Sequence, residues 1–267
     1  MLFLKLLLYS ELDPAGVNIA SHLMLEIPFR ETYLGKIKAL FYEDIYLIST
    51  KEQLVNININ FPDVSYAIFL SKHKSESGLV CLTTHTPGNL CNKAELGGNP
   101  KEVAISNPPI IRAILKNLHK FVKEYEINIP VTIEATHHGP TNLNFPVTFV
   151  EIGSNELAWK NNKFGEIVAK SILYSINSSI EIQSGGLGIG GGHYSEKFTN
   201  KILNENILIG HIIPKYAMIE GMETSMIELC IKRTLGGCSK VYIDWKGTPS
   251  IYKEYLKSMK NIEIIRI

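Results

Sequence analysis

The segment Glu134-Ala135-Thr136-His137-His138-Gly139-Pro140 places one carboxylate and two imidazoles within five positions. It follows the apolar run 130–133, which is typical of a buried strand, and a Gly-Pro pair ends it. Imidazole and carboxylate groups are ligands that suit zinc, and they also transfer protons near neutral pH. The segment therefore predicts a metal or acid–base site at the end of a strand, with two histidines in an ordinary turn as the alternative.

Further polar side chains of the same character lie at or just beyond the ends of other runs, namely His85, Glu151 with Ser154, His193 and His211. Ligands of open α/β sheets gather beyond the carboxyl ends of the strands, so these side chains are expected to converge. His211 lies inside an apolar run, and a buried core histidine is an equally good interpretation of it. The remaining histidines stand in helical or polar surroundings and are predicted to be surface residues: His22, His73 and His119.

The glycine-rich passage before His193 has six glycines in the eight positions 185–192. Glycine lets backbone N–H groups approach a ligand closely and form a nest for an anion or an oxyanion. The spacing fits neither the Walker nor the Rossmann pattern, and a flexible linker is the alternative. Because His193 and Tyr194 follow at once, we favour a backbone cradle that ends in polar side chains.

Strand and helix patterns alternate along most of the chain. Strands are predicted over 2–9, 37–42, 45–49, 66–70, 79–83, 129–135, 147–152, 207–213 and 241–245. Helices are predicted over 14–25, 108–125, 156–176 and 223–234, with a short one from about 195, and segments 252–259 and 262–267 close the chain. This order indicates a three-layer α/β/α fold with a mixed, mostly parallel sheet in one domain over 1–267. Residues 92–107 are irregular and predict a flap or a small sub-lobe.

The composition limits the partners and the compartment. The 267 residues carry 27 basic and 26 acidic side chains, a net charge of +1, so any contact with nucleic acid must come from a local basic patch. The four widely spaced cysteines argue for a reducing compartment and against a cysteine zinc knuckle. The apolar N-terminal run is interrupted by Lys5 and lacks a cleavage site, and no stretch approaches the ~20 apolar residues of a membrane span. We therefore expect a soluble, cytoplasmic protein.

Five motifs in series resemble the archaeal and plant type of D-aminoacyl-tRNA deacylase. They are Thr84-His85-Thr86-Pro87-Gly88-Asn89, Glu134-Ala135-Thr136-His137-His138-Gly139-Pro140-Thr141, Val150-Glu151-Ile152-Gly153-Ser154, Gly190-Gly191-Gly192-His193-Tyr194 and Gly210-His211-Ile212-Ile213-Pro214-Lys215-Tyr216-Ala217. The N-terminal strand followed by Asp13-Pro14-Ala15-Gly16 also looks like the start of that family. The resemblance runs from residue 1 to about residue 250, and residues 51–62 and 92–106 add nothing to it.

The resemblance implies a zinc-dependent hydrolase with a fold similar to the phosphorylase and peptidyl-tRNA hydrolase group. Its reaction would be cleavage of the ester between a D-amino acid and the 3′-terminal ribose of tRNA, which recycles mischarged tRNA. The implied partner is aminoacyl-tRNA, with no role for DNA or a membrane, and the chain would act as a monomer or homodimer.

The residues give this reaction a concrete hypothesis. One or two Zn²⁺ ions are expected among His85, His137, Glu151 and His193, and Glu134 or His138 would take up the proton of water. The substrate is expected to meet Gly190, Gly191, Gly192, Tyr194 and Lys215. His137 and His138 can share a metal only if the strand has already ended, because adjacent strand residues point to opposite faces.

Phosphate contacts could also come from scattered cations, although solvated surface side chains are the simpler interpretation: Lys93, Lys101, Arg112 and Lys246. Two other classes of function stay open. One is a metal-dependent peptidase or amidase, or a nucleoside phosphorylase, on a related fold. The other is a non-catalytic protein that binds RNA or stores metal.

Overall fold

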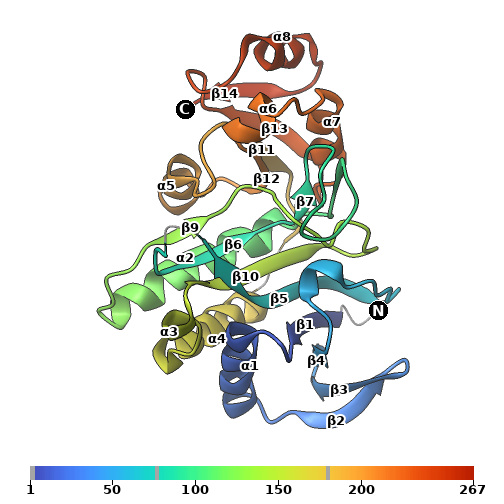
Figure 1. Ribbon diagram of the computed structural model, residues 1–267, viewed down its shortest axis with the longest axis vertical. Helices are drawn as coiled ribbons and strands as arrows, with labels where there is room; N and C mark the ends of the chain where they lie inside the picture. The colour runs from blue at the N-terminus through green and yellow to red at the C-terminus, as the bar shows by residue number, and fades with distance from the viewer. Residues whose placement is uncertain (1–3, 76–77, 179–180) are drawn as a thin grey trace.

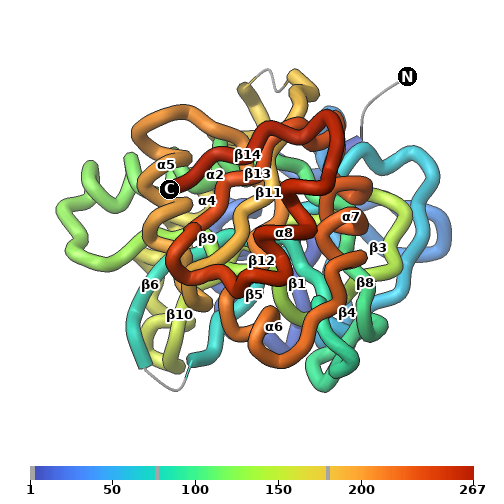
Figure 2. Tube along the Cα trace, turned by 90° about the horizontal axis from the view of Figure 1, so that it is seen from above, coloured from blue at the N-terminus to red at the C-terminus, as the bar shows by residue number. Residues whose placement is uncertain are grey.

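The computed structural model describes residues 4–75, 78–178 and 181–267 of the chain (Figure 1). The larger sheet of this part runs, in spatial order, through β2 (Arg30–Leu34), β3 (Ile37–Tyr42), β4 (Ile45–Thr50), β1 (Leu4–Ser10), β5 (Val64–Lys74), β10 (Val147–Ser154), β6 (Cys81–His85) and β9 (Val131–Ile133). The smaller sheet runs through β12 (Ile209–Ile213), β11 (Gly185–Ile189), β13 (Cys238–Ile243) and β14 (Glu263–Arg266). Figure 1 shows the smaller sheet above the larger one along the longest axis, so the smaller sheet is nearer to the viewer in Figure 2, which is seen from above.

Strand directions in the two sheets agree with the predicted mixed, mostly parallel arrangement. In the larger sheet, β1 pairs in parallel with β4 and β5, β5 with β10, and β6 with β9, whereas β2–β3, β3–β4 and β10–β6 are antiparallel. All pairs of the smaller sheet are parallel. The predicted α/β fold class is confirmed. The prediction of a single domain over 1–267 stays a prediction.

The helices cover one face of the larger sheet and both faces of the smaller one. Their bounds are α1 (Pro14–Glu26), α2 (Pro108–Glu124), α3 (Glu156–Trp159), α4 (Asn162–Asn177), α5 (Glu196–Glu205), α6 (Lys215–Ile219), α7 (Ser225–Lys232) and α8 (Ser250–Ser258). Residues of α1, α2 and α4 share one core with β5 and β10, and α6, α7 and α8 share another with β11 and β13. The opposite face of the larger sheet is covered by the 3₁₀ turn η1 (Leu54–Asn56) and irregular chain, including Leu143 and Phe145.

Successive side chains of a strand point to opposite faces of the sheet, which decides the core in which each one packs. In β1, Leu7 packs in the helix-covered core, whereas Leu6 and Leu8 pack on the helix-free face. In β10, Val150 and Ile152 belong to the first core, so Glu151 between them is directed to the helix-free face.

Local sequence signals account for most helix starts. The Asp13 side chain accepts hydrogen bonds from the N–H groups of Ala15 and Gly16 and caps α1. The single helix predicted over 156–176 is wrong, because α3 ends at Trp159 and α4 begins at Asn162. The side chain of Asn161 accepts from the N–H groups at 163 and 164, so it starts a new helix instead of continuing the old one.

The sequence predictions also differ from the structure at the edges of the larger sheet. The edge strand β2 was not predicted, and its residues are mostly exposed, so it lacks an apolar pattern. The strand predicted over 129–135 is confined to Val131–Ile133. The predicted first strand is confirmed from Leu4 to Tyr9, and its first two residues lie outside the described part.

Residues 92–107 are irregular, as predicted, apart from the short β8 (Glu102–Val103), which pairs with β7 (Gly88–Asn89). Among the described residues, no helix combines the length and the apolar character needed to span a bilayer.

Candidate active site

The segment 134–136 joins the two sheets through its backbone. The N–H of Glu134 donates to the carbonyl of Thr84 in the larger sheet at 3.1 Å. Two residues later the N–H of Thr136 donates to the carbonyl of Ile212 in the smaller sheet at 2.9 Å. The side chains from Glu134 to His138 therefore emerge at the junction between the sheets.

The helix-free face of the larger sheet supplies three more polar side chains to this junction. In β10, Glu151 lies opposite Ser71 of β5 on one side and Thr83 of β6 on the other. His73 and His85 lie two residues farther along those neighbouring strands, on the same face. Glu151 is 2% exposed and His85 is 1% exposed, so both are shielded from solvent.

The sequence prediction for His73 as a surface residue is wrong, because this side chain is only 5% exposed. The predicted strand ended at Leu70, whereas β5 continues to Lys74 and carries His73 to the junction. Phe69, Ser71 and His73 are all buried at a spacing of two. Continuing the alternation past the apolar run would have revealed this residue.

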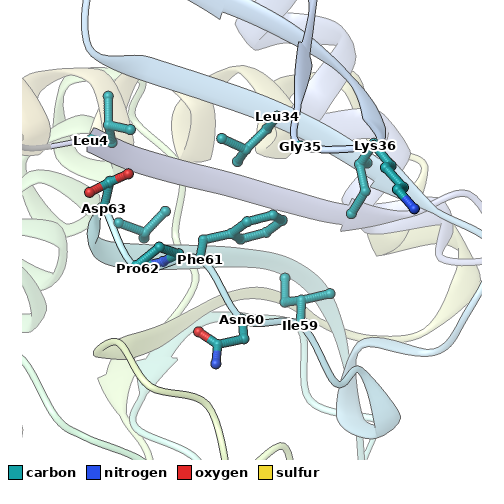
Figure 3. A pocket seen from close by; sticks show the side chains of 11 residues that line it. Leu4, Leu34, Gly35, Lys36, Ile59, Asn60, Phe61, Pro62 and Asp63 are labelled. Carbon is teal, nitrogen blue, oxygen red and sulfur yellow. The ribbon is translucent and has the colours of Figure 1, made fainter.

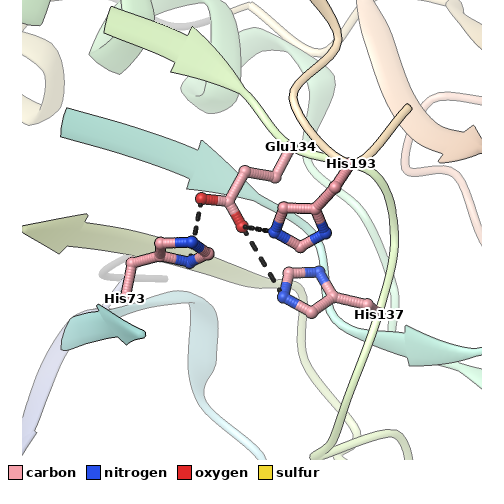
Figure 4. A group of neighbouring side chains, drawn as sticks. All are labelled: His73, Glu134, His137 and His193. Carbon is pink, nitrogen blue, oxygen red and sulfur yellow. Dashed lines mark ion pairs between the residues drawn. The ribbon is translucent and has the colours of Figure 1, made fainter. Parts of the chain in front are cut away.

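Glu134 stands at the centre of the cluster (Figure 4). Its Oε2 atom lies 3.2 Å from His193 Nε2, 3.6 Å from His137 Nε2 and 3.7 Å from His85 Nδ1. Its Oε1 atom lies 3.2 Å from Nδ1 of His73. One buried carboxylate thus meets four imidazoles, three of which face the same oxygen.

Hydrogen bonds outside the cluster decide which ring nitrogens carry lone pairs. His137 Nδ1 donates to the carbonyl of Ala135 at 2.8 Å, and His138 Nδ1 donates to the carbonyl of Gly139 at 2.6 Å. In a neutral imidazole the other nitrogen is then an acceptor. His137 Nε2 therefore presents a lone pair to Glu134.

His138 sets the protonation of His85 in the same way. The Nε2 atoms of these two rings lie 3.3 Å apart, and His138 has only a lone pair to offer there, so His85 Nε2 donates. His85 Nδ1 then also presents a lone pair to Glu134. His138 has a left-handed backbone with φ of 44°, which is uncommon for a non-glycine residue and is found in strained functional segments.

Burial and neighbouring rings keep these imidazoles neutral. Burial, with the neighbouring His137 and His138, holds the pKa of His85 well below its ordinary value. Burial and His138 do the same for His137, and burial lowers the pKa of His138 to about 4. At neutral pH these rings therefore carry the lone pairs assigned above.

The pKa values of the carboxylates of Glu134 and Glu151 shift in opposite directions. Burial alone would raise the pKa of Glu134, but the surrounding histidines, His193 first, outweigh burial and lower it. Burial, reinforced by the charge of Glu134, raises the pKa of Glu151 to about 7 despite the contact with His73. For His73, burial is outweighed by Glu151 and Glu134, so its pKa is raised. His73 Nδ1 also lies 3.4 Å from Glu151 Oε2, so this imidazole faces both carboxylates.

The donor set fits a bound cation. Two imidazole lone pairs and a carboxylate oxygen face one another without a hydrogen between them, which is repulsive unless a cation lies among them. Both oxygens of Glu134, Nδ1 of His85 and Oε2 of Glu151 are buried without a hydrogen-bond partner among the described residues. Three overlapping sets have donor atoms within 4.8 Å of one another: His73, Glu134, His137 and His193; His85, His137 and His138; His85, Glu134 and Glu151.

The predicted site residues lie together, but Glu134 takes part in more of the ligand sets than Glu151. All four predicted metal ligands and both predicted acid–base residues lie in the cluster: His85, His137, Glu151, His193, Glu134 and His138. Glu134 belongs to two of the three sets, whereas Glu151 belongs to one. The strand had to end before His137 for His137 and His138 to share a ligand set, and β9 does end at Ile133.

The glycine-rich passage is partly a strand. Gly185–Ile189 forms the buried β11, where a Cβ on Gly186 would lie 2.6 Å from the ring of Tyr242, so glycine permits the close packing. After β11 the N–H of Gly190 donates to the carbonyl of Ile213 at 2.8 Å and is not available to a ligand. Among the described residues, Gly191 and Gly192 donate no such bond, and Gly191 has a φ of 77°.

A hollow of about 180 Å³ lies beside this passage, lined by Gly191, Gly192, Tyr194, Ser195, Glu196, Lys197, Phe198 and Asp244. Tyr194 also contacts the cluster, since its hydroxyl lies 2.9 Å from His73 Nε2. It thus connects the hollow to the carboxylates. Lys215 begins α6 with an exposed side chain that forms no ion pair within the described residues.

Comparison with known proteins identifies the family. A family model described as D-aminoacyl-tRNA deacylase matches residues 60–267. A D-aminoacyl-tRNA deacylase of Methanococcus vannielii is 37% identical over 267 residues, with 97% of each chain covered. The chain belongs to the D-aminoacyl-tRNA deacylase family. The corresponding protein of Pyrococcus furiosus is 32% identical over 268 residues, again with 97% of each chain covered.

A solved structure agrees with the fold. The crystal structure of AF0625, described as a conserved protein of unknown function, has a TM-score of 0.88 and 28% identity, and the match covers 98% of this chain and 95% of that chain. Deacylases of this family are hydrolases acting on ester bonds. The family resemblance and the prediction of an ester hydrolase are therefore confirmed, in preference to a peptidase or a phosphorylase.

Two further features of this deacylase lie outside the ligand sets. His211 is fully buried, and its Nδ1 lies 3.3 Å from the hydroxyl of Thr136, so it supports the segment that carries His137. A hollow of about 520 Å³ lies at the β2–β3 hairpin (Figure 3), lined mainly by apolar side chains such as Leu34, Ile59 and Phe61. It contains neither histidine nor glutamate, so the chemistry belongs to the cluster at the junction.

Proposed function

We propose that the cluster around Glu134 hydrolyses the ester between a D-amino acid and the 3′-terminal ribose of tRNA. One observation carries the proposal: the lone pairs of His85 and His137 converge with His193 on a single buried oxygen of Glu134. Such an arrangement favours a bound cation, and three imidazoles with a carboxylate suit zinc. The family membership supplies the class of substrate.

The geometry favours Glu134 over Glu151 as the oxygen ligand of a zinc ion. Glu134 faces all three imidazoles, and their presence lowers its pKa, so it is the carboxylate that stays charged. A zinc ion held by His85, His137, His193 and Glu134 would polarise the ester carbonyl and lower the pKa of water. His138 then acts as a positioning residue, because both of its ring nitrogens are engaged by Gly139 and His85.

Glu151 is the better candidate for proton transfer. Its pKa of about 7 lets it accept and return a proton near neutral pH. In the reaction the oxygen of water bonds to the carbonyl carbon of the ester and the bond to the ribose oxygen breaks. Glu151 takes one proton from the water and returns it to the ribose oxygen, so the products are a D-amino acid and uncharged tRNA.

The N–H groups of Gly191 and Gly192, which donate no backbone hydrogen bond within the described ranges, support a role in binding the negative charge that develops on the carbonyl oxygen. A Cβ on Gly192 would meet nothing within 4 Å, so a ligand has open access to this backbone. The neighbouring hollow, with Tyr194 in its wall, offers space for the terminal nucleoside. Lys215 is proposed to meet a phosphate from its exposed position on α6.

The decisive experiment compares hydrolysis of D-tyrosyl-tRNA and L-tyrosyl-tRNA, each with chelator and with zinc added back. We expect the enzyme to hydrolyse the D-tyrosyl ester alone. Chelator should abolish this hydrolysis, and added zinc should restore it. D-selective turnover that resists thorough chelation would remove the metal from the proposal and leave Glu134 as an acid–base group. Failure to hydrolyse either ester would refute the proposed activity.

A further inference from the structure

The indole ring of Trp245 holds three cationic side chains around it. The guanidinium carbon of Arg266 lies 3.9 Å from the ring centroid, and the Nζ atoms of Lys253 and Lys257 lie 5.2 and 5.6 Å from it. These are cation–π distances, and they fix the side chains next to one another. We call Trp245, Lys253, Lys257 and Arg266 the cationic patch.

The charges of the patch are not neutralised by carboxylates. Within the described residues, Lys253, Lys257 and Arg266 form no ion pair, whereas neighbouring lysines do, as in Lys197–Asp244 and Lys240–Glu263. Three like charges gathered on one ring repel one another, so the site has a positive potential that an anion would relieve. The whole chain has a net charge of only +1, which makes this concentration a local feature.

The patch lies at the carboxyl ends of the parallel strands of the smaller sheet, the end that also borders the proposed active site. Trp245 follows Asp244, whose side chain lines the hollow beside Gly191 and Gly192. Arg266 lies opposite Ile243 at the same end of the parallel strands β13 and β14. Strand β14 is two strands away from β11, about 10 Å across the sheet. The cations therefore lie within a few nucleotides' reach of the glycine-rich passage.

We propose that the cationic patch binds backbone phosphates of the tRNA strand that ends in the scissile ester. This inference rests on the proposed function, which brings the terminal nucleoside to the glycine-rich passage. The tRNA strand must then leave the hollow, and the patch offers cations that have no ion-pair partner among the described residues, at the same end of the sheet. Lysine and arginine side chains bind phosphates without reading sequence, which suits an enzyme that must accept different tRNAs.

The test uses the double variant Lys253→Gln/Lys257→Gln and the single variant Arg266→Gln. The matched control is Lys36→Gln/Lys51→Gln, which removes two exposed lysines that form no ion pair within the described residues. Binding of uncharged tRNA is measured by fluorescence anisotropy across a salt series. We expect the patch double variant to bind tRNA about 10-fold more weakly than the control variant. The slope of log K against log salt concentration should become shallower by roughly 1.5, the value for two phosphate contacts.

Hydrolysis of two substrates separates this inference from the proposed function. The patch variants should lower kcat/KM for D-tyrosyl-tRNA mainly through KM, and should leave hydrolysis of the D-tyrosyl ester of adenosine unchanged. Equal tRNA binding by patch and control variants would overturn the patch, even if the enzyme is fully active. Loss of binding to an acidic polypeptide but not to tRNA would also overturn it. An inactive wild-type enzyme would refute the activity, while the anisotropy measurement would still decide the patch.

Discussion

Glu134 and His193 meet between the two sheets, with Oε2 of the carboxylate 3.2 Å from Nε2 of the imidazole. Glu134 follows β9 of the larger sheet, and His193 follows β11 of the smaller one. Their backbones are tied as well, because Glu134 and Tyr194 form an isolated antiparallel bridge. The central contact of the site thus depends on the docking of the sheets, because the smaller sheet supplies His193, one of the four proposed zinc ligands.

We predict that Glu134→Gln removes zinc binding and activity while the fold persists. The amide keeps the shape of the side chain but loses the charge that three imidazoles face. Zinc affinity and kcat/KM should fall about 100-fold or more, since even partners outside the ligand shell contribute about 10–100-fold. Isothermal titration with zinc and turnover of D-tyrosyl-tRNA check this. Glu166→Gln in α4 is the matched control, and near wild-type activity of Glu134→Gln would contradict the central role.

His138 gives a prediction that separates positioning from proton transfer. His138→Ala deprives His85 Nε2 of its acceptor, so His85 can protonate at Nδ1 and lose the lone pair that faces Glu134. We expect about 10–100-fold weaker zinc binding and turnover. His138→Gln, whose side-chain carbonyl can accept from His85, should recover much of both. If the two variants are equally inactive and bind zinc normally, His138 has a direct role in the reaction.

Several site residues could be found from the sequence because strand ends and alternation obey simple rules. His85, Glu151 and His137 follow recognisable apolar runs, so their convergence follows from an open α/β sheet. His73 was not predicted because its strand changes from apolar to polar residues at Ser71, although every second side chain remains buried as far as His73. A run of apolar residues identifies the centre of a strand, but it does not show where the strand ends or which polar side chains its last residues carry.

Other features depend on tertiary contacts that a single sequence does not display. The strand β11 is glycine-rich because Tyr242 packs against its backbone, and that neighbour lies far along the chain. The lone pairs of His85 and His137 depend on carbonyl partners at Gly139 and Ala135. The division of roles between Glu134 and Glu151 likewise follows from which carboxylate faces the imidazoles.

Zinc is predicted to stabilise the fold as well as support turnover. Buried donor atoms of Glu134 and His85 lack hydrogen-bond partners in the described part of the chain, and an ion that binds them in the folded state alone shifts unfolding by mass action. At 100 times Kd the gain is about 2.7 kcal/mol, or roughly 5–10 °C in Tm for a chain of this size. Thermal melts with chelator and with added zinc measure it. Magnesium and the His137→Ala variant should give no comparable shift, and an equal shift in that variant would exclude the site.

A pH prediction concerns the network of Tyr125, Glu166 and Lys170, which links α2 to α4 outside the active site. The hydroxyl of Tyr125 donates to Glu166 at 2.6 Å, and Lys170 donates at 2.9 Å. These hydrogen bonds lower the pKa of Glu166 from its ordinary value of 4.5 to about 2. Because the folded pKa is depressed, the stabilisation is complete above pH 4.5 and is lost as the pH falls toward 2.

We expect Glu166→Gln to lower the free energy of unfolding at pH 7 by about 1 kcal/mol, a value reduced for solvent screening because the side chain is 30% exposed. The difference between wild type and variant should shrink steadily between pH 4.5 and 2, since protonated Glu166 resembles the amide. Urea unfolding across this pH range measures the difference directly. A difference that stays constant with pH would show that the charge of Glu166 contributes nothing, and that the network acts through packing of α2 against α4.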